Sequence, residues 1–342
     1  MLGGRNMKRI AVLCVGNDCP GLNAAIRAAT VKASELNIEI LGVKDGFEGF
    51  LSGKIEVMTR NTVSGILHKG GTILGTSLFL PVNEEDIVQV AEKVEQYSIT
   101  CLLILGGRLG VRAALKLMQS GVPSVLVPAT IDNDLSFSDF SIGFFTAVEH
   151  VKDALDILHA TAESHHRVMI VETMGKPGGW IAVVGGLAGG ADYIITSAEP
   201  LDIQELLKKI RSRYESQKRF SLVIVENDVN LPGEIYQLAN MDSHIPPAEA
   251  IGEFLEKQLK DINMEWRYTN LGYLQRGGSP VSMDRLIAIQ MATRAVEMVK
   301  AARVYHAVGM KGLTVTEVPY SDTMINVRTV EEHLKNLAKL FY

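Results

Sequence analysis

Short strand-like runs alternate with longer helical patterns along almost the whole of this sequence. An apolar, β-rich run at residues 10–15 leads through a loop containing Gly and Pro into a helical pattern at 23–36, and a second strand pattern follows at 38–43. The alternation resumes with a helix predicted at 84–97 and a strand at 100–105. Strand, helix and strand at these lengths favour parallel pairing, with helices on both faces of a sheet.

The second half of the chain repeats this alternation. Further strands are predicted at 124–127, 168–172, 194–196 and 222–225, and further helices at 145–160, 203–214 and 247–262. With 342 residues the chain is long enough for two α/β domains. Because ligands of such sheets bind at the carboxyl ends of the strands, the loops that follow residues 15, 105 and 127 are the first places to search for a site.

Composition and charge exclude several classes of protein. A hydrophobic content of 47% and a charged content of 21% are those of a globular chain, and a net charge of -5 argues against general attraction to nucleic acid or membrane. The apolar runs have the length of buried strands and are too short to span a bilayer or to form a secretion signal. The cysteines, Cys14, Cys19 and Cys101, have no metal-binding spacing, so we expect reduced thiols in a cytoplasmic protein and no metal site built by the chain alone.

Two carboxylates follow the strand predicted at 124–127. The segment 130–134 reads Thr-Ile-Asp-Asn-Asp, which places Asp132 and Asp134 at a strand's end, where a side chain can project into a cleft. There a carboxylate can act as the general base that takes a proton from a hydroxyl group. The alternative for a generic Asp-Asn-Asp segment is a turn capped by its own side chains.

Three arginines and a glutamate are candidates for binding a phosphorylated ligand. Arg167 and Arg267 belong to strand patterns, and Arg276 lies in a segment with two glycines, which suits a bidentate contact to phosphate. Glu226 ends the strand predicted at 222–225 and can accept hydrogen bonds from sugar hydroxyls. Taken singly, each arginine is more typical of a surface ion pair and Glu226 of an ordinary strand-end carboxylate.

Five motifs in order change this assessment, because together they resemble the phosphofructokinases from about residue 8 to the end of the chain. They are Asp18-x-Pro20-Gly21-x-Asn23-Ala24-Ala25-Ile26-Arg27, Gly70-Gly71-Thr72-x-Leu74-Gly75, Pro128-Ala129-Thr130-Ile131-Asp132-Asn133-Asp134, Ile142-Gly143-Phe144-x-Thr146-Ala147 and Gln275-Arg276-Gly277-Gly278-Ser279-Pro280.

The resemblance implies an α/β fold of two doubly wound, Rossmann-like domains with an active-site cleft between them. Residues 1–143 with 275–306 would form the donor-side domain, and residues 144–274 with 307–342 the domain on the sugar-phosphate side.

The resemblance also implies a reaction of glycolysis, the phosphorylation of the 1-hydroxyl of fructose 6-phosphate by Mg-ATP or pyrophosphate. Asp132 would be the base, with Thr130 and Asp134 beside it, and Lys176 would replace an arginine that steadies the transition state. The remaining acceptor residues would be Met174 and Glu226 on the sugar, Arg276 and Tyr273 (in place of a histidine) on the 6-phosphate, and Arg167 and Arg267 reaching in from a neighbouring subunit.

The donor side departs from the family's pattern. The loop that carries an aspartate for Mg²⁺ reads Gly106-Gly107-Arg108-Leu109-Gly110, and a guanidinium offers the cation no oxygen ligand. Leu78 replaces an arginine that reaches the transferred phosphate, and Asn17 replaces the glycine after Gly16 that lets phosphate approach. Ala129 stands where the ATP and pyrophosphate subfamilies carry Gly or Lys, so the phosphoryl donor stays open.

The family's nucleotide effector site is matched only in part. Arg27 and Arg60 match its basic cluster, whereas other positions of that cluster hold Val31, His159, Glu215 and Gln217. The resemblance further implies a homotetramer, or a hetero-oligomer with an active relative.

Two hypotheses therefore stand after the sequence. The first, which the donor loop favours, is a sugar-phosphate-binding or regulatory paralogue in which transfer is impaired or lost, because phosphoryl transfer depends on positioning and charge neutralisation. The second is an active, divergent 6-phosphofructokinase that uses ATP or pyrophosphate, and the presence of Asp132 favours it.

Overall fold

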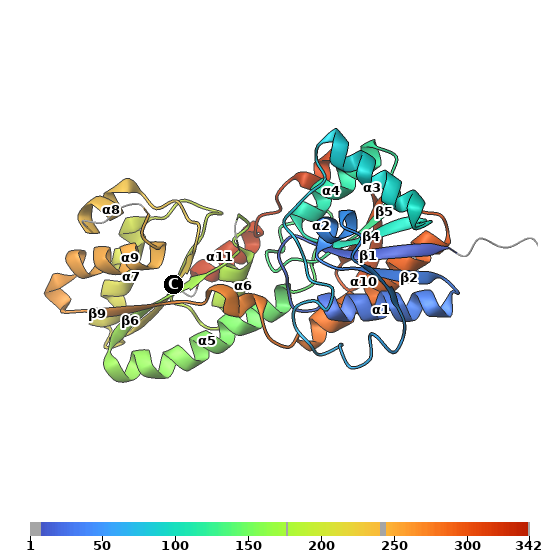
Figure 1. Cartoon of the computed structure of the whole chain (residues 1–342). Helices are drawn as coiled ribbons and strands as arrows, with labels where there is room; N and C mark the ends of the chain where they lie inside the picture. The colour runs from blue at the N-terminus through green and yellow to red at the C-terminus, as the bar shows by residue number, and fades with distance from the viewer. Residues whose placement is uncertain (1–7, 176, 240–243, 341–342) are drawn as a thin grey trace, which may run out of the picture. The chain divides into compact units, whose positions relative to one another are not determined.

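The computed structural model describes residues 8–175, 177–239 and 244–340, and the chain divides into two compact units. Unit 1 contains residues up to 131, residues 135–146 and residues 276–326. Unit 2 contains residues 132–134, residues 147–275 and the remainder of the chain from 327. Both units are α/β, as the sequence predicts (Figure 1).

Unit 1 is built on a seven-stranded sheet in the order β11-β10-β5-β4-β1-β2-β3. Its central strands pair in parallel, whereas the two edge strands, β3 and β11, run antiparallel to their neighbours. The strands are β1 (Arg9–Val15), β2 (Glu39–Val43), β3 (Ile55–Met58), β4 (Cys101–Gly106), β5 (Ser124–Pro128), β10 (His306–Lys311) and β11 (Thr314–Pro319).

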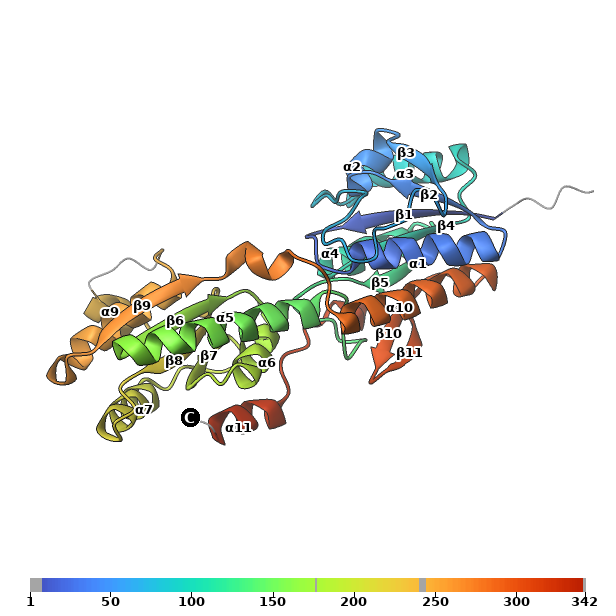
Figure 2. The ribbon, with the colours of Figure 1, turned by 90° about the horizontal axis from the view of Figure 1, so that it is seen from below.

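Helices cover both faces of this sheet. On one face α1 and α10 lie side by side, and on the other α2, α3 and α4 pack against alternate sheet residues such as Leu13, Leu102 and Ile104 (Figures 1 and 2). The helices of this unit are α1 (Leu22–Glu35), α2 (Gly46–Leu51), α3 (Glu84–Gln96), α4 (Arg108–Gln119), α10 (Ser282–Lys300) and the 3-10 turn η3 (Asp322–Ile325). β1 and β4 are buried along almost their whole length, as strands of a sheet covered on both faces must be.

Unit 2 is built on a four-stranded parallel sheet in the order β7-β8-β6-β9. Its elements are β6 (Arg167–Thr173), β7 (Tyr193–Ile195), β8 (Ser221–Glu226), β9 (Glu265–Asn270), α6 (Trp180–Ala188), α7 (Ile203–Glu215), α8 (Gly233–Ala239), α9 (Pro247–Gln258), the 3-10 turns η1 (Lys260–Ile262) and η2 (Gly272–Arg276), and α11 (Glu332–Leu340). α5 (Phe144–His165) begins in unit 1 and continues into unit 2.

The core of unit 2 lies between the sheet and α7, α8 and α9, where Ile170, Val223, Leu206 and Phe254 are buried. α6 packs on the opposite face, because a Cβ added at Gly186 would lie 2.6 Å from Ile194 Cδ1. Small residues in α6 thus let the helix approach the sheet closely.

The structure differs from the predicted domain assignment at the C-terminal end. Residues 307–342 were expected on the sugar-phosphate side, but β10 and β11 belong to the sheet of unit 1, where β10 pairs with β5. Only residues from 327 onward belong to unit 2. A long-range pairing of this kind leaves no local pattern, so periodicity alone does not show which sheet a hairpin joins.

No helix in the described part of the chain is long and apolar enough to cross a bilayer. The three cysteines, Cys14, Cys19 and Cys101, are buried free thiols.

Candidate active site

The strand order of unit 1 gathers three loops at one edge of its sheet. β5, β4 and β1 are neighbours and parallel, so the loops after Val15, Gly106 and Pro128 leave the same edge. A Cβ added at Gly107 would lie 2.9 Å from Thr130 Cβ, and one at Gly16 would lie 3.6 Å from Leu109. These contacts bring Gly16, Gly107, Leu109 and Thr130 together at this edge.

The segment that contains Leu78 joins the same edge. Gly16 N donates to Ser77 O at 2.9 Å, and Thr76 Oγ1 donates to Gly16 O at 2.7 Å. Leu78 is 64% exposed and Asn17 is exposed as well. An apolar side chain therefore occupies an open position beside the loop, where it offers no charge to a phosphate.

Arg108 begins α4 and is exposed. The N-cap, Gly107, makes no side-chain capping hydrogen bond, and the first turn contains no acidic residue, so the positive end of the helix and the guanidinium reinforce one another. Magnesium prefers oxygen ligands. The loop supplies a cation instead, and no group of three or more His, Cys, Asp or Glu among the residues described could hold a metal ion. The loop of residues 106–110 therefore offers no carboxylate of its own to a magnesium ion.

The segment of residues 130–134 folds into a tight loop after β5. Thr130 N donates to Ile142 O at 3.0 Å and Ser141 Oγ donates to Thr130 O at 2.7 Å, which fixes the start of the loop. Asn133 adopts the left-handed conformation with φ 53°, and Asn133 and Asp134 are both buried. Asp132 is only half-buried, so it is more accessible than Asn133 and Asp134.

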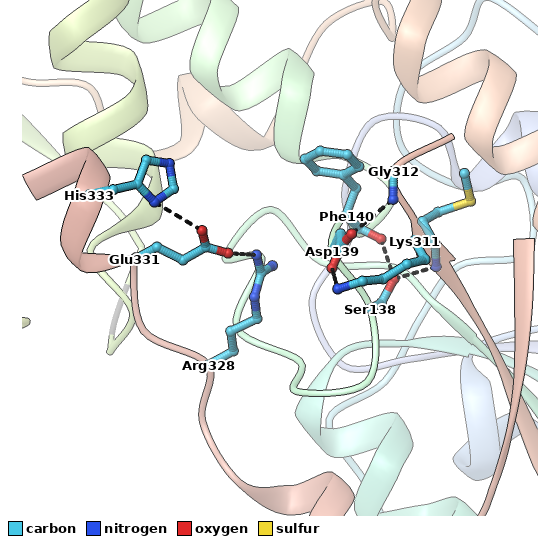
Figure 3. Close-up of polar contacts among 9 residues, drawn as sticks. Ser138, Asp139, Phe140, Lys311, Gly312, Arg328, Glu331 and His333 are labelled. Atoms are coloured by element: carbon cyan, nitrogen blue, oxygen red, sulfur yellow. Dashed lines mark hydrogen bonds and ion pairs between the residues drawn. The ribbon is translucent and has the colours of Figure 1, made fainter. Parts of the chain in front are cut away.

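The chain after this loop is held by the hairpin of β10 and β11 within unit 1. Ser138 Oγ accepts from Met310 N at 2.8 Å, and Asp139 accepts from Lys311 Nζ at 3.1 Å and from Gly312 N at 2.8 Å (Figure 3). The hairpin that the sequence did not assign to this unit thus supports the segment that follows the candidate base.

In unit 2, Glu226 ends β8 and its side chain is fully buried. Ser197 N donates to Glu226 Oε2 at 2.6 Å, whereas Oε1 is buried without a hydrogen-bond partner in the described parts of the chain. Burial raises the pKa of this carboxyl, partly offset by its hydrogen bonds. A buried carboxylate oxygen of this kind is costly unless a ligand donates to it.

Met174 and Tyr273 line one pocket of unit 2. The pocket measures about 590 Å³, and its other lining residues include Asn227 and Asn270. Met174 follows β6 directly, and its backbone N donates to Gln275 Oε1 at 3.2 Å. Tyr273 is 82% exposed, so its hydroxyl is available to a ligand.

Arg276 ends η2 and opens the return of the chain to unit 1. Its Nε is buried and finds no hydrogen-bond partner in the part of the chain that is described. A guanidinium left in this state suits an anion, because Arg donates a rigid fork of hydrogen bonds to phosphate oxygens.

The two remaining arginines lie at the opposite end of the unit 2 sheet. Arg167 opens β6 and its Nε contacts Glu265 Oε2 at 2.8 Å, while Arg267 Nη2 lies 3.8 Å from the same oxygen. Arg167 precedes Met174 by the full length of β6, about 20 Å at the rise of a strand. One subunit therefore does not bring Arg167 to its own Met174 pocket.

Lys176 and the two arginines of the expected effector site, Arg27 and Arg60, are the remaining predicted residues. Lys176 lies outside the described residues. Arg60 lines a pocket of about 290 Å³ with Thr30 and Ser34, to which its Nε donates at 3.2 Å, but Arg27 does not line this pocket.

Sequence reasoning missed two residues that hold the site's surroundings. Gln275 lies within a quoted motif but received no role, although it fixes Met174 N. Asp284, on α10, is fully buried and accepts from Gly143 N at 2.9 Å and Thr146 N at 2.7 Å, capping the start of α5. An aspartate in the first turn of a helix gives no local signal of such a distant partner.

Comparisons with known proteins agree with this architecture. The family model described as phosphofructokinase matches residues 9–299. The chain is 37% identical over 341 residues to the pyrophosphate--fructose 6-phosphate 1-phosphotransferase of Dictyoglomus thermophilum, covering 98% of this chain and 96% of that one. It is also 37% identical over 339 residues to the ATP-dependent 6-phosphofructokinase of Chloroflexus aurantiacus, covering 95% and 94%.

Solved structures show the same fold. The pyrophosphate-dependent phosphofructokinase from Nitrosospira multiformis matches with a TM-score of 0.84 at 19% identity, covering 95% of this chain and 86% of that one. The Pichia pastoris phosphofructokinase in the T-state matches with a TM-score of 0.82 at 25% identity, and this chain spans 39% of its length. The relatives' names include both phosphoryl donors, so similarity leaves the donor open.

Proposed function

The chain belongs to the phosphofructokinase family, and from this premise we propose that it binds fructose 6-phosphate while phosphoryl transfer from Mg-ATP is impaired. The observation that carries the sugar-binding part is Glu226, whose buried Oε1 has no hydrogen-bond donor among the residues described. A sugar hydroxyl is the donor that this oxygen needs. The pocket of Met174 and Tyr273 in the same unit is lined by Asn227, the residue that follows Glu226 in the chain.

The charged residues have complementary roles in this proposal. Arg276 holds the 6-phosphate through a guanidinium whose Nε has no protein partner in the described segments. Asp132 accepts the hydrogen bond of the 1-hydroxyl and is placed to take its proton, while the buried Asp134 and the backbone of Thr130 support it. Proton removal is the step in which this chain's own residues favour transfer.

The donor loop is what supports the proposal of impaired transfer. Phosphoryl transfer depends on neutralising the charge of the phosphates and holding them in line. Arg108 removes the family's carboxylate for the metal, and Leu78 removes a cation, so both the metal and the direct charge contact are lost. Loss of one such stabilising group commonly costs roughly 100-fold in rate.

An active transferase is the second candidate, and Asp132 favours it. Transfer needs a base at the 1-hydroxyl, which binding alone does not, and the relatives' names describe transferases that use pyrophosphate or ATP. Arg108 would then neutralise the donor's phosphates in place of the metal, and transfer would not require Mg²⁺.

A single set of measurements separates these candidates. Calorimetry should show binding of fructose 6-phosphate, and Arg276→Ala should weaken it roughly ten- to a hundredfold, because a charged hydrogen-bonding partner is lost. Arg211→Ala, which removes an exposed ion pair with Asp261 in unit 2, is the control and should leave the affinity unchanged.

Turnover is then measured with ATP and with pyrophosphate, each with and without Mg²⁺. Negligible formation of fructose 1,6-bisphosphate with all four supports the binding protein. Rapid transfer with either donor overturns the proposal that phosphoryl transfer is impaired. Absence of sugar-phosphate binding overturns the proposed function as a whole.

A further inference from the structure

A short segment of unit 2 links the loop of the candidate base to the start of α6. Arg328 N donates to Asp134 O at 2.8 Å, and Arg328 O accepts from Trp180 Nε1 at 3.0 Å. One residue therefore bridges two elements that are more than 40 residues apart in the sequence. Both contacts are made by backbone atoms of Arg328.

The side chain of Arg328 is fixed on two sides. Its guanidinium carbon lies 4.1 Å from the centroid of the Trp180 ring. Its Nη2 donates to Glu331 Oε1 at 3.2 Å, a contact drawn in Figure 3. The side chain is only 16% exposed, so the contact of the cation with the ring face is partly shielded from water. His333 Nδ1 lies 3.2 Å from the other oxygen of Glu331.

The neighbouring backbone continues this attachment. Val330 N donates to Gly178 O at 2.8 Å, and a Cβ added at Gly178 would lie 3.1 Å from Arg328 O. Gly178 belongs to the segment between β6 and α6, the segment that starts with Met174. Arg328 thus contacts both the loop of Asp132 and the segment that leads from the sugar pocket.

The loop of Asp132 has a physical need for such support. Asn133 holds a left-handed backbone with φ 53°, a conformation that non-glycine residues adopt at a cost and keep only when their surroundings impose it. Asn133 and Asp134 are buried, so a shift of this loop would also disturb their packing. The backbone hydrogen bond from Arg328 opposes that shift at the residue that follows Asn133.

We infer that Arg328 is a positioning residue, which holds the Asp132–Asp134 loop so that Asp132 meets the 1-hydroxyl of the bound sugar phosphate. This inference rests on the proposed function, because it names what a second residue does for the same ligand. Arg328 itself does not contact the ligand. Its effect is transmitted through the stacking on Trp180 and the hydrogen bond to Asp134.

Two ligands separate positioning from general stability. Fructose 6-phosphate carries the 1-hydroxyl, and 1-deoxyfructose 6-phosphate lacks it while retaining the phosphate. The dissociation constant of the deoxy ligand divided by that of fructose 6-phosphate measures what the 1-hydroxyl contributes to binding. Arg328→Met keeps the apolar stem but removes the cation, and it should reduce this ratio roughly five- to tenfold, the value of one hydrogen bond, towards one. The affinity for the deoxy ligand should change less than about twofold.

Matched variants complete the experiment. Arg328→Lys retains a cation over the ring and should recover most of the ratio, whereas Arg211→Met on the surface of the same unit should leave it unchanged. Trp180→Phe keeps an aromatic ring but removes the Nε1 donor, and it should lower the ratio in the same direction. It tests the inference independently if Arg328→Met fails to fold.

The outcomes are distinct. A selective fall in the ratio supports the inference. An equal loss for both ligands, or no loss, overturns it while the proposed function stands, provided that the unmodified protein binds fructose 6-phosphate. A protein that binds neither ligand overturns the proposed function and this inference together.

Discussion

At the scale of the residue, Asp284 is a buried carboxylate whose charge is costly. Burial raises the pKa of Asp284 from 3.8 to about 6, although the hydrogen bonds from Thr146 and Gly143 oppose this shift. Because the folded pKa lies above the unfolded one, the folded state binds the proton more tightly. The resulting stabilisation is complete below about pH 4 and is lost as the pH rises through about 6.

Asp284→Asn removes this titration. The unfolding free energy of the variant should therefore lack the part of the pH dependence that lies between pH 4 and 6. The difference in unfolding free energy between the native protein and the variant should fall by about 2 kcal/mol across this window. Thermal or urea unfolding at a series of pH values measures it. Asp322→Asn, an exposed position in the same unit, is the control. A constant difference between native and variant protein from pH 4 to 7 would contradict the prediction.

At the scale of the element, local periodicity predicts most strands and helices because their apolar spacing is written in consecutive residues. The helix predicted at 84–97 and the strand at 222–225 correspond to α3 and β8 within one or two residues. β10 and β11 could not be assigned to a sheet, since their place depends on pairing with β5 far away in the sequence.

The candidate site likewise has one part that local sequence patterns predict and another part that only long-range packing decides. The gathering of Gly16, Gly107 and Thr130 follows from parallel strands that end at one edge, so the sequence predicts it. The contacts of Gln275 with Met174 and of Arg328 with Trp180 depend on long-range packing. No spacing of residue types encodes them, so they required the structure.

Packing between elements makes one glycine of α9 indispensable. A Cβ added at Gly252 would lie 2.1 Å from Cε3 of Trp266 on β9, so helix and strand would have to separate. Gly252→Ala should therefore destabilise the protein by about 1–3 kcal/mol, measured by urea unfolding. Gly233→Ala is the matched control, because nothing lies within 4 Å of the added carbon, and it should be neutral. Equal effects of the two substitutions would refute this account of α9.

At the scale of the whole molecule, the positions of Arg167 and Arg267 bear on assembly. Both lie beside Glu265 at the end of the sheet away from Met174 and Glu226. If they bind the 6-phosphate, as the family resemblance implies, they do so in a neighbouring subunit. We therefore propose a homo-oligomer in which each binding site takes arginines from two copies of the chain.

Subunit mixing tests this proposal. Arg276→Ala removes a site residue of the chain's own pocket, whereas Arg267→Ala removes one that is lent to the partner, so each variant alone should bind fructose 6-phosphate weakly. In a hybrid, one site carries both defects and the other carries none. Co-refolding equal amounts should then restore tight binding in about a quarter of all sites, the share expected for random two-fold pairs. Calorimetric titration of the mixture gives this fraction directly. Arg267 acting within its own subunit would leave no intact site in any hybrid, and the mixture would bind as weakly as the separate variants.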